Sequence, residues 1–128
     1  MDQLTQNSRQ RPTIVLVEDD RSLLNALVFA LEADGFNVNA YTSAKPVLAS
    51  PVIADCMVID LKLPDLDGLT LVARLREMGS VSPAILITTN PDGRSRKAAA
   101  VAGVEIVEKP LITGELRTRI DEAIAANS

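Results

Sequence analysis

Several short segments of the chain are apolar almost without a break, and this pattern limits the folds that the chain can adopt. The segments are residues 13–17 (TIVLV), 54–60 (ADCMVID), 84–88 (AILIT) and 104–108 (VEIVE). A strand with one solvated face alternates apolar and polar residues, whereas a strand covered on both faces is apolar throughout. Residues 36–40 (FNVNA) alternate, as a strand nearer an edge does. The pattern predicts a parallel sheet covered by helices on both faces.

Segments with helical spacing separate these strands, and their apolar residues recur three and four positions apart. The expected helices are one from Asp20 to Gly35 with Leu24, Leu27, Val28 and Leu31 on its apolar side, a short one from a Ser43 cap to about Ala49, residues 69–78 with Leu71, Val72, Leu75 and Met78 inward, an alanine-rich helix ending near Ala102, and a closing helix capped by Thr113 with Leu116, Ile120 and Ile124 inward. Strands that alternate with helices predict an α/β fold with a doubly wound sheet of five strands and five helices. We expect a flexible tail over residues 1–12 and one domain over residues 13–126.

Composition excludes several classes of function. The chain of 128 residues has no histidine, which removes a Ser-His-Asp or Cys-His arrangement, and its net charge of −4 disfavours direct binding of nucleic acid. Its single cysteine, Cys56, cannot form an internal disulfide, fits a reducing compartment and is expected in the core. The six glycines are scattered and form no phosphate-binding loop. Without an apolar window of about 18 residues or a signal peptide, we expect a cytoplasmic protein outside the membrane.

Polar side chains follow four of the expected strands. Glu18, Asp19 and Asp20 end the first apolar segment, and the others deliver Asp60, the pair Thr88–Thr89, and Lys109 before Pro110. In open parallel sheets, functional groups gather at the carboxyl ends of the strands. We therefore expect these side chains at one edge of the sheet.

The residue types at this edge suggest phosphoryl chemistry with a cation. Two carboxylates about 4 Å apart repel each other by roughly 4 kcal/mol at an effective dielectric constant of 20. Oxygen ligands without histidine or cysteine favour Mg²⁺. A carboxylate such as Asp60 can act as a nucleophile, and Lys109 and Thr88 can hold phosphoryl oxygens. Each residue alone also has a structural interpretation: a helix cap, a solvated lysine, or a strand hydroxyl.

Four segments, VLVEDD, VIDLKLPDLDG, ILITT and VEKP, resemble the signature segments of response regulator receiver domains, the CheY-like superfamily of two-component signalling. The resemblance spans residues 13–126. It implies a flavodoxin-like parallel sheet of strand order 2-1-3-4-5. It also implies that the chain accepts a phosphoryl group from a sensor histidine kinase, a histidine phosphotransfer protein or a small phosphodonor.

The resemblance also implies a role for each matching residue. Asp60 would be the phosphoacceptor, and Thr88, the Thr89 backbone N–H and Lys109 would contact the phosphoryl group. Asp19 and Asp60 would bind Mg²⁺ directly, Glu18 largely through water, and Lys62 through its backbone carbonyl. The Lys109–Pro110 bond would be cis, Gly68 would relieve a tight turn, and Asp20 would begin the first helix rather than bind metal.

The chain departs from the family pattern at one notable position. Ile106 stands where the last strand usually carries a switch aromatic, so coupling from Thr88 to the surface must use a smaller residue or be weaker. Lys62 and Asn90 occupy the variable positions beside the phosphoryl site, and we expect them to set the dephosphorylation rate. Phe29 lies off the apolar stripe of the first helix, on the side where kinases dock in this family. Residues 94–97 (RSRK) are expected to be a solvated helix start.

The main functional hypothesis is a phosphorylation-controlled switch that changes its surface for a downstream protein target. Its only chemistry would be its own phosphorylation and dephosphorylation, and it would be a monomer or a phosphorylation-dependent dimer. One alternative is a receiver fragment of a larger transcriptional regulator. A second is an Mg²⁺-dependent phosphohydrolase with an aspartyl phosphate, although that class would need an Asp-x-Asp after the first strand. A third is an interaction module that works without phosphorylation.

Overall fold

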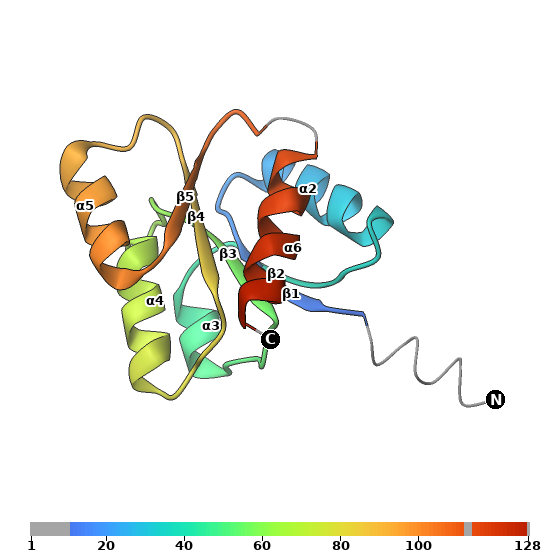
Figure 1. The fold of residues 1–128 in the computed structure, drawn as a ribbon. Coiled ribbons are helices and arrows are strands. Elements are labelled where there is room, and N and C mark those ends of the chain that lie inside the picture. The colour runs from blue at the N-terminus through green and yellow to red at the C-terminus, as the bar shows by residue number, and fades with distance from the viewer. Residues whose placement is uncertain (1–10, 112–113, 128) are drawn as a thin grey trace.

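The structure is a computed structural model that describes residues 11–111 and 114–127. The expected cap Thr113 and most of the expected tail lie outside these residues. The elements, drawn in Figure 1, are β1 (Thr13–Val17), α2 (Arg21–Ala33), β2 (Asn37–Tyr41), α3 (Lys45–Ala49), β3 (Cys56–Asp60), α4 (Gly68–Glu77), β4 (Ala84–Thr88), α5 (Gly93–Ala102), β5 (Glu105–Glu108) and α6 (Glu115–Asn127).

The strands form one parallel sheet of order β2-β1-β3-β4-β5, which confirms the predicted fold class. All residues of β3 and β4 are buried, whereas β2, at an edge, has none that is fully buried. The apolar segments of β1, β3 and β4 therefore form central strands, and the alternating segment of β2 forms an edge. The segment 104–108 was also expected to be covered on both faces, but it forms the other edge, β5, in which only Val107 is buried. The register places Val17 of β1 beside Ile59 of β3, so the residues that follow these two strands emerge side by side.

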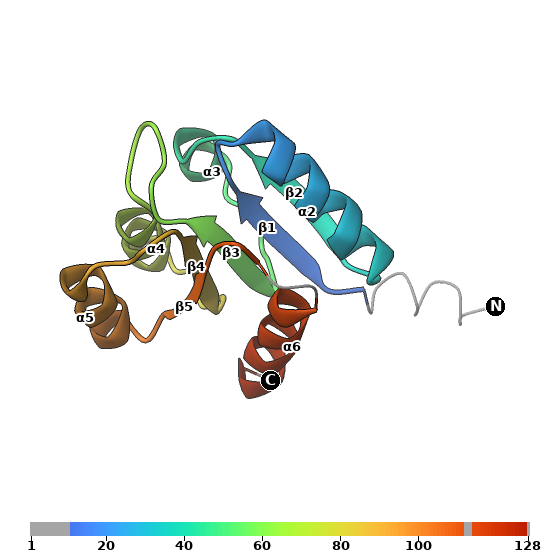
Figure 2. The same ribbon diagram turned by 90° about the horizontal axis from the view of Figure 1, so that it is seen from above.

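Helices cover both faces of the sheet, and each face has its own apolar core. Figure 2, seen from above, shows α2 and α6 on one side and α3, α4 and α5 on the other. The core under α2 and α6 includes Leu24, Leu27 and Leu31, and the core on the opposite face includes Leu71 and Leu75. No helix in the described part of the chain is long and apolar enough to cross a membrane.

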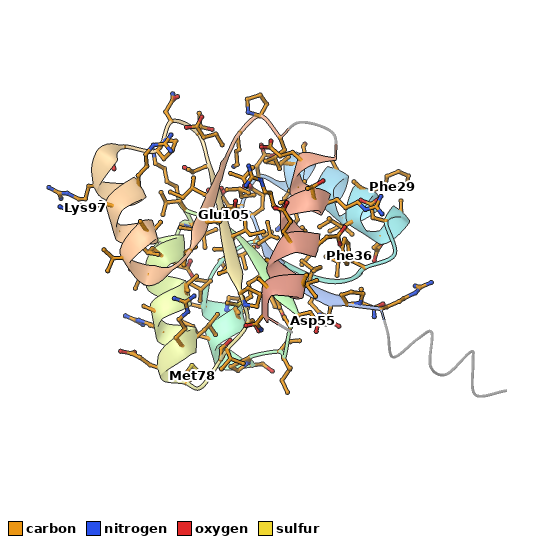
Figure 3. All side chains as sticks on the ribbon, in the orientation of Figure 1. Phe29, Phe36, Asp55, Met78, Lys97 and Glu105 are labelled. Carbon is orange, nitrogen blue, oxygen red and sulfur yellow. The ribbon has the colours of Figure 1, made fainter. Side chains whose placement is uncertain are left out.

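Two local predictions were wrong. Ser43 does not cap α3: the N-cap position is Ala44, whose side chain cannot accept a hydrogen bond. The carboxylate of Asp65 takes this role instead, because its two oxygens accept the backbone N–H groups of Ala44 (3.0 Å) and Lys45 (2.8 Å). Met78 is the C-cap of α4 and is 57% exposed rather than inward, since the chain turns away there at Gly79 (Figure 3).

Candidate functional site

Three carboxylates meet at the carboxyl edge of the sheet. Glu18 and Asp19 follow β1, Asp60 ends β3, and each offers one oxygen within 4.8 Å of the others. Glu18 and Asp60 are buried, whereas Asp19 is exposed. The acid cluster predicted from the strand ends is therefore present, and it opens to solvent on the side of Asp19.

Glu18 is a fully buried acid that the backbone holds in place. Its N–H donates to the carbonyl of Tyr41 at 3.0 Å, which extends the pairing of β1 with β2. Its Oε2 accepts the N–H of Asp20 at 3.1 Å. Burial raises the pKa of Glu18 to about 7, partly offset by the Lys109 ammonium and reinforced by the negative charge of Asp60.

Lys109 is the cation that the protein itself supplies to this cluster. Its Nζ lies 2.8 Å from Glu18 Oε1 and 3.1 Å from Asp60 Oδ2. Burial alone would lower the pKa of Lys109, but its contacts with Glu18 and Asp60 outweigh burial and raise that pKa above its ordinary value. One ammonium against three carboxyl groups leaves room for further positive charge.

Both carboxylate oxygens of Asp60 have a donor, so the side chain is fixed. Oδ1 accepts the backbone N–H of Lys62 at 3.1 Å, and Oδ2 faces Lys109. The loop over residues 61–67 is closed behind it, where the N–H of Gly68 donates to the carbonyl of Leu61 at 2.7 Å. A Cβ on Gly68 would lie 2.4 Å from the carbonyl oxygen of Asp60, so glycine is needed here for close approach.

Thr88 ends β4 and is buried, and the exposed Thr89 follows it. The carbonyl of Thr88 accepts the N–H of Lys109 at 2.7 Å, which ties the end of β4 to the residue after β5. The structure thus brings all the site residues expected from the sequence to one edge of the sheet. Asn90, the next exposed residue, has a φ of 48°, a left-handed conformation that asparagine tolerates.

Asp20 separates from the two acids before it, as the sequence analysis expected. It is the N-cap of α2, and its side chain accepts the N–H groups of Ser22 and Leu23. An aspartate at this position satisfies helix donors that would otherwise have no partner. The run of three acids therefore divides into two members of the acid cluster and one helix cap.

The cluster fits a divalent cation with oxygen ligands. The donor set consists of carboxylates without nitrogen or sulfur, which suits Mg²⁺. Glu18 Oε1 is buried and, among the described residues, has no hydrogen-bond donor in good geometry, even with the Lys109 ammonium beside it. A buried, partly satisfied carboxylate is costly unless a positive charge compensates it.

Two contacts in and near the site were not predicted from the sequence. The direct ion pair of Glu18 with Lys109 joins residues 91 positions apart, and no local motif signals it. The bonds of Asp65 to the start of α3 were also missed. The sequence offers only a weak signal for this contact, namely that Asp65 is one of two aspartates in the 61–67 loop. The other, Asp67, caps α4, the helix that directly follows the loop.

Three further expectations concern single side chains. Cys56 is fully buried, and burial raises its pKa to about 12. Phe29 is 77% exposed on the outer side of α2 (Figure 3), as its position off the apolar stripe predicted. Ile106 of β5 is half-buried and packs against the core under α3, α4 and α5.

Comparison with known proteins agrees with this geometry. Residues 14–121 match the family described as the response regulator receiver domain. The chain is 32% identical over 118 residues to the transcriptional regulatory protein CreB of Escherichia coli, covering 87% of this chain and 50% of CreB. It is 33% identical to the KDP operon transcriptional regulatory protein KdpE of the same organism, with 90% and 52% covered. The chain spans about half the length of these relatives.

Solved structures show the same fold. A CheY-like receiver domain protein from Methanospirillum hungatei superposes with a TM-score of 0.86 at 23% identity, covering 92% of this chain and 97% of that one. The non-phosphorylated HemR receiver domain from Leptospira biflexa superposes with a TM-score of 0.82 at 28% identity, with 90% and 95% covered. Sequence and structure comparisons therefore lead to the same group of proteins.

Proposed function

The chain belongs to the response regulator receiver domain family of two-component signalling, and on this premise we propose that Asp60 is its phosphoacceptor. A receiver is a signalling domain rather than an enzyme, so the relevant chemistry is its own phosphorylation. The observation that supports Asp60 best is its environment: a buried carboxylate, fixed by Lys62 N–H and Lys109 Nζ, inside a cluster of three acids. In this proposal the receiver domain comprises residues 13–126.

The proposed reaction is the transfer of one phosphoryl group to a carboxylate oxygen of Asp60. The oxygen attacks phosphorus as the bond between phosphorus and the donor atom breaks, and the donor leaves with that electron pair and takes up a proton where it needs one. Asp60 becomes an acyl phosphate, and water later attacks its phosphorus to return the carboxylate and release phosphate. Fixing the carboxylate before reaction lowers the entropic part of the barrier.

The residues around Asp60 have distinct proposed roles. Glu18, Asp19, Asp60 and the backbone carbonyl of Lys62 would hold Mg²⁺, which when bound supplies positive charge to the phosphoryl oxygens. Lys109 would exchange its contact with Asp60 for one with the phosphoryl group, a movement that suits the compact charge and flexible side chain of lysine.

The remaining site residues would read or limit the phosphorylated state. The Thr88 hydroxyl and Thr89 N–H, at the end of β4, would bind phosphoryl oxygens. Lys62 and Asn90, both exposed beside the site, would set the rate of dephosphorylation by controlling the approach of water. The signal from Thr88 would pass through the aliphatic Ile106 rather than through a rotating aromatic ring.

Kinases phosphorylate receiver domains of response regulators, and the partner proposed here is a sensor histidine kinase or a histidine phosphotransfer protein. Phe29 on α2 would belong to its docking surface. The surface changed by phosphorylation would act on a downstream protein target. The relatives are transcriptional regulators of about twice this length, so the alternative is that the chain is the receiver part of such a regulator. We also propose that the protein is cytoplasmic and that it is a monomer or a phosphorylation-dependent dimer.

The test is incubation with acetyl phosphate and Mg²⁺, followed by intact mass measurement. The wild type should gain one phosphoryl group, and Asp60→Asn should gain none. A gain in both proteins, or in neither, would overturn the assignment of Asp60. Decay of the added mass after removal of acetyl phosphate tests Lys62 as well: Lys62→Asn should lose the group faster, and an equal lifetime would remove Lys62 from this role.

A further inference from the structure

Asp65 links two loops that are distant in the sequence. It lies in the 61–67 loop between β3 and α4, and its two carboxylate oxygens accept the N–H groups of Ala44 and Lys45, 21 and 20 residues away. The distances, 3.0 and 2.8 Å, are those of normal hydrogen bonds to a charged acceptor. These bonds lower the pKa of Asp65, so the carboxylate is ionised at neutral pH.

The start of α3 depends on this contact. Its N-cap residue, Ala44, has no side-chain acceptor, and the first N–H groups of a helix have no partner within the helix. Asp65 supplies that partner from another loop, whereas α2, α4 and α5 are each capped by the aspartate that precedes them. The hydrogen bonds that cap α3 therefore also connect the 61–67 loop to the start of α3. This contact is called the Asp65 tie below.

The loop that Asp65 anchors also contacts the Asp60 carboxylate. Lys62 donates its N–H to Asp60 Oδ1, and an isolated antiparallel bridge pairs Lys62 with Asp67. Leu63 and Leu66 pack against the core under α3, α4 and α5. Between these contacts, Asp65 is the point at which the loop bonds to the segment that follows β2, and Tyr41 of that strand in turn holds the backbone of Glu18.

We propose that Asp65 is a positioning residue for the metal site: by holding the 61–67 loop in place, it would keep the backbone carbonyl of Lys62 where it can bind the cation. The inference rests on the proposed function in one respect, the use of the Lys62 carbonyl as a ligand. Asp65 does not contact the cation itself: its effect passes through the backbone of the two intervening residues, Leu63 and Pro64.

Coupling of this kind is reciprocal. If the Asp65 tie favours Mg²⁺ binding, Mg²⁺ must strengthen the tie by the same factor. The amide hydrogens of Ala44 and Lys45 report on the tie directly, since their exchange with solvent requires that the bonds to Asp65 open. Mg²⁺ should therefore slow exchange at these two amides, although neither residue is a proposed ligand.

The experiment is a Mg²⁺ titration followed by amide chemical shifts in wild type, Asp65→Ala and Asp65→Asn. Amide hydrogen exchange with and without Mg²⁺ and unfolding by urea are measured in parallel. Asp55→Ala is the matched control, because Asp55 also accepts one backbone N–H, that of Thr13 at 2.8 Å, at the opposite edge of the sheet (Figure 3). Asp65→Asn keeps one oxygen acceptor and serves if Asp65→Ala does not fold. No phosphodonor is present, so failure of Asp60 to accept a phosphoryl group would leave this result intact.

Asp65→Ala should weaken Mg²⁺ binding by about 3- to 10-fold, less than the about 10- to 100-fold lost when a direct partner of a metal ligand is removed. Asp65→Asn should lie between it and wild type, and Asp55→Ala should bind Mg²⁺ as wild type does despite its lower stability. The slowing of exchange at Ala44 and Lys45 by Mg²⁺ should occur in wild type. Equal midpoints of the Mg²⁺ titration in all variants would overturn the proposal, because they would show that Asp65 only caps α3. Rates of hydrogen exchange at Ala44 and Lys45 that are the same with and without Mg²⁺ would also overturn it.

Discussion

The side-chain nitrogen of Lys109 lies 3.1 Å from Oδ2 of Asp60, although 49 residues separate them in the sequence. The same nitrogen lies 2.8 Å from the fully buried Glu18. Lys109 is therefore both the internal counterion of the acid cluster and, in the proposed reaction, the group that moves to the phosphoryl oxygens. Its two roles can be separated by experiment.

Lys109→Ala should lower stability and slow phosphorylation. Without the ammonium, Glu18 and Asp60 remain close together in a buried site, and a buried charged group that loses its partner costs about 1–3 kcal/mol or more. The free energy of unfolding, from urea titration without Mg²⁺, and the initial rate of phosphoryl gain from acetyl phosphate measure the two effects. Unchanged stability would contradict the counterion role, and an unchanged rate would contradict the role in transfer.

Asp19→Asn should raise the stability of the metal-free protein and remove its response to Mg²⁺. Asp19 is the exposed member of the acid cluster, so its loss relieves repulsion with little loss of packing. Wild type should gain about 2.7 kcal/mol at a Mg²⁺ concentration 100 times the dissociation constant. Glu32→Gln, which removes an exposed acid on α2 away from the cluster, is the control and should keep the response to Mg²⁺. Equal Mg²⁺ stabilisation of Asp19→Asn and wild type would show that the cation does not use this site.

Gly68→Ala should destabilise the protein, whereas Gly93→Ala should not. Both glycines are the first residue of a helix, α4 and α5, so helix propensity favours alanine equally in both. A Cβ at Gly68 would lie 2.4 Å from the Asp60 carbonyl oxygen, but a Cβ at Gly93 would meet nothing within 4 Å. We expect a loss of about 1–3 kcal/mol for the first and a small gain for the second. Equal thermal midpoints for the two variants would show that the close approach at Gly68 carries no energetic cost.

The sequence predicted the site better than the loops around it. Parallel strands bring their carboxyl ends to one edge, so Glu18, Asp60, Thr88 and Lys109 could be placed together because each follows or ends an expected strand. Strand ends do not show whether Ser43 or Asp65 caps α3. Ser43 has the local signature of an N-cap, but Asp65 reaches α3 only because the loop after β3 folds back over it, a contact 20 residues away. Similarly, spacing placed Met78 inward, and only the end of α4 at that residue explains its exposure.

The thiol of Cys56 should be unreactive in the native protein. Burial raises its pKa from the ordinary 9.0 to about 12, so the thiolate that reacts with alkylating agents is scarce below that pH. In the unfolded chain the Cys56 thiol ionises near its ordinary pKa of 9.0, whereas in the folded protein it stays protonated up to about pH 12. The unfolded state therefore gains stability from this ionisation, and the free energy of unfolding falls as pH rises from about 9 toward 12. Alkylation at pH 8 should follow the unfolded fraction as urea is added, and Cys56→Ala should flatten the alkaline loss of stability. Rapid labelling without urea would contradict the burial of Cys56.

The central claim is that the phosphoryl group resides on Asp60 as an acyl phosphate. The most direct measurement is reduction of the phosphorylated protein with borohydride, which converts an aspartyl phosphate to homoserine, followed by peptide mass mapping. The account predicts homoserine at position 60 and loss of the phosphoryl group on treatment with hydroxylamine. Homoserine at Asp19 or elsewhere, or a hydroxylamine-stable phosphoryl group on Thr88, would contradict it.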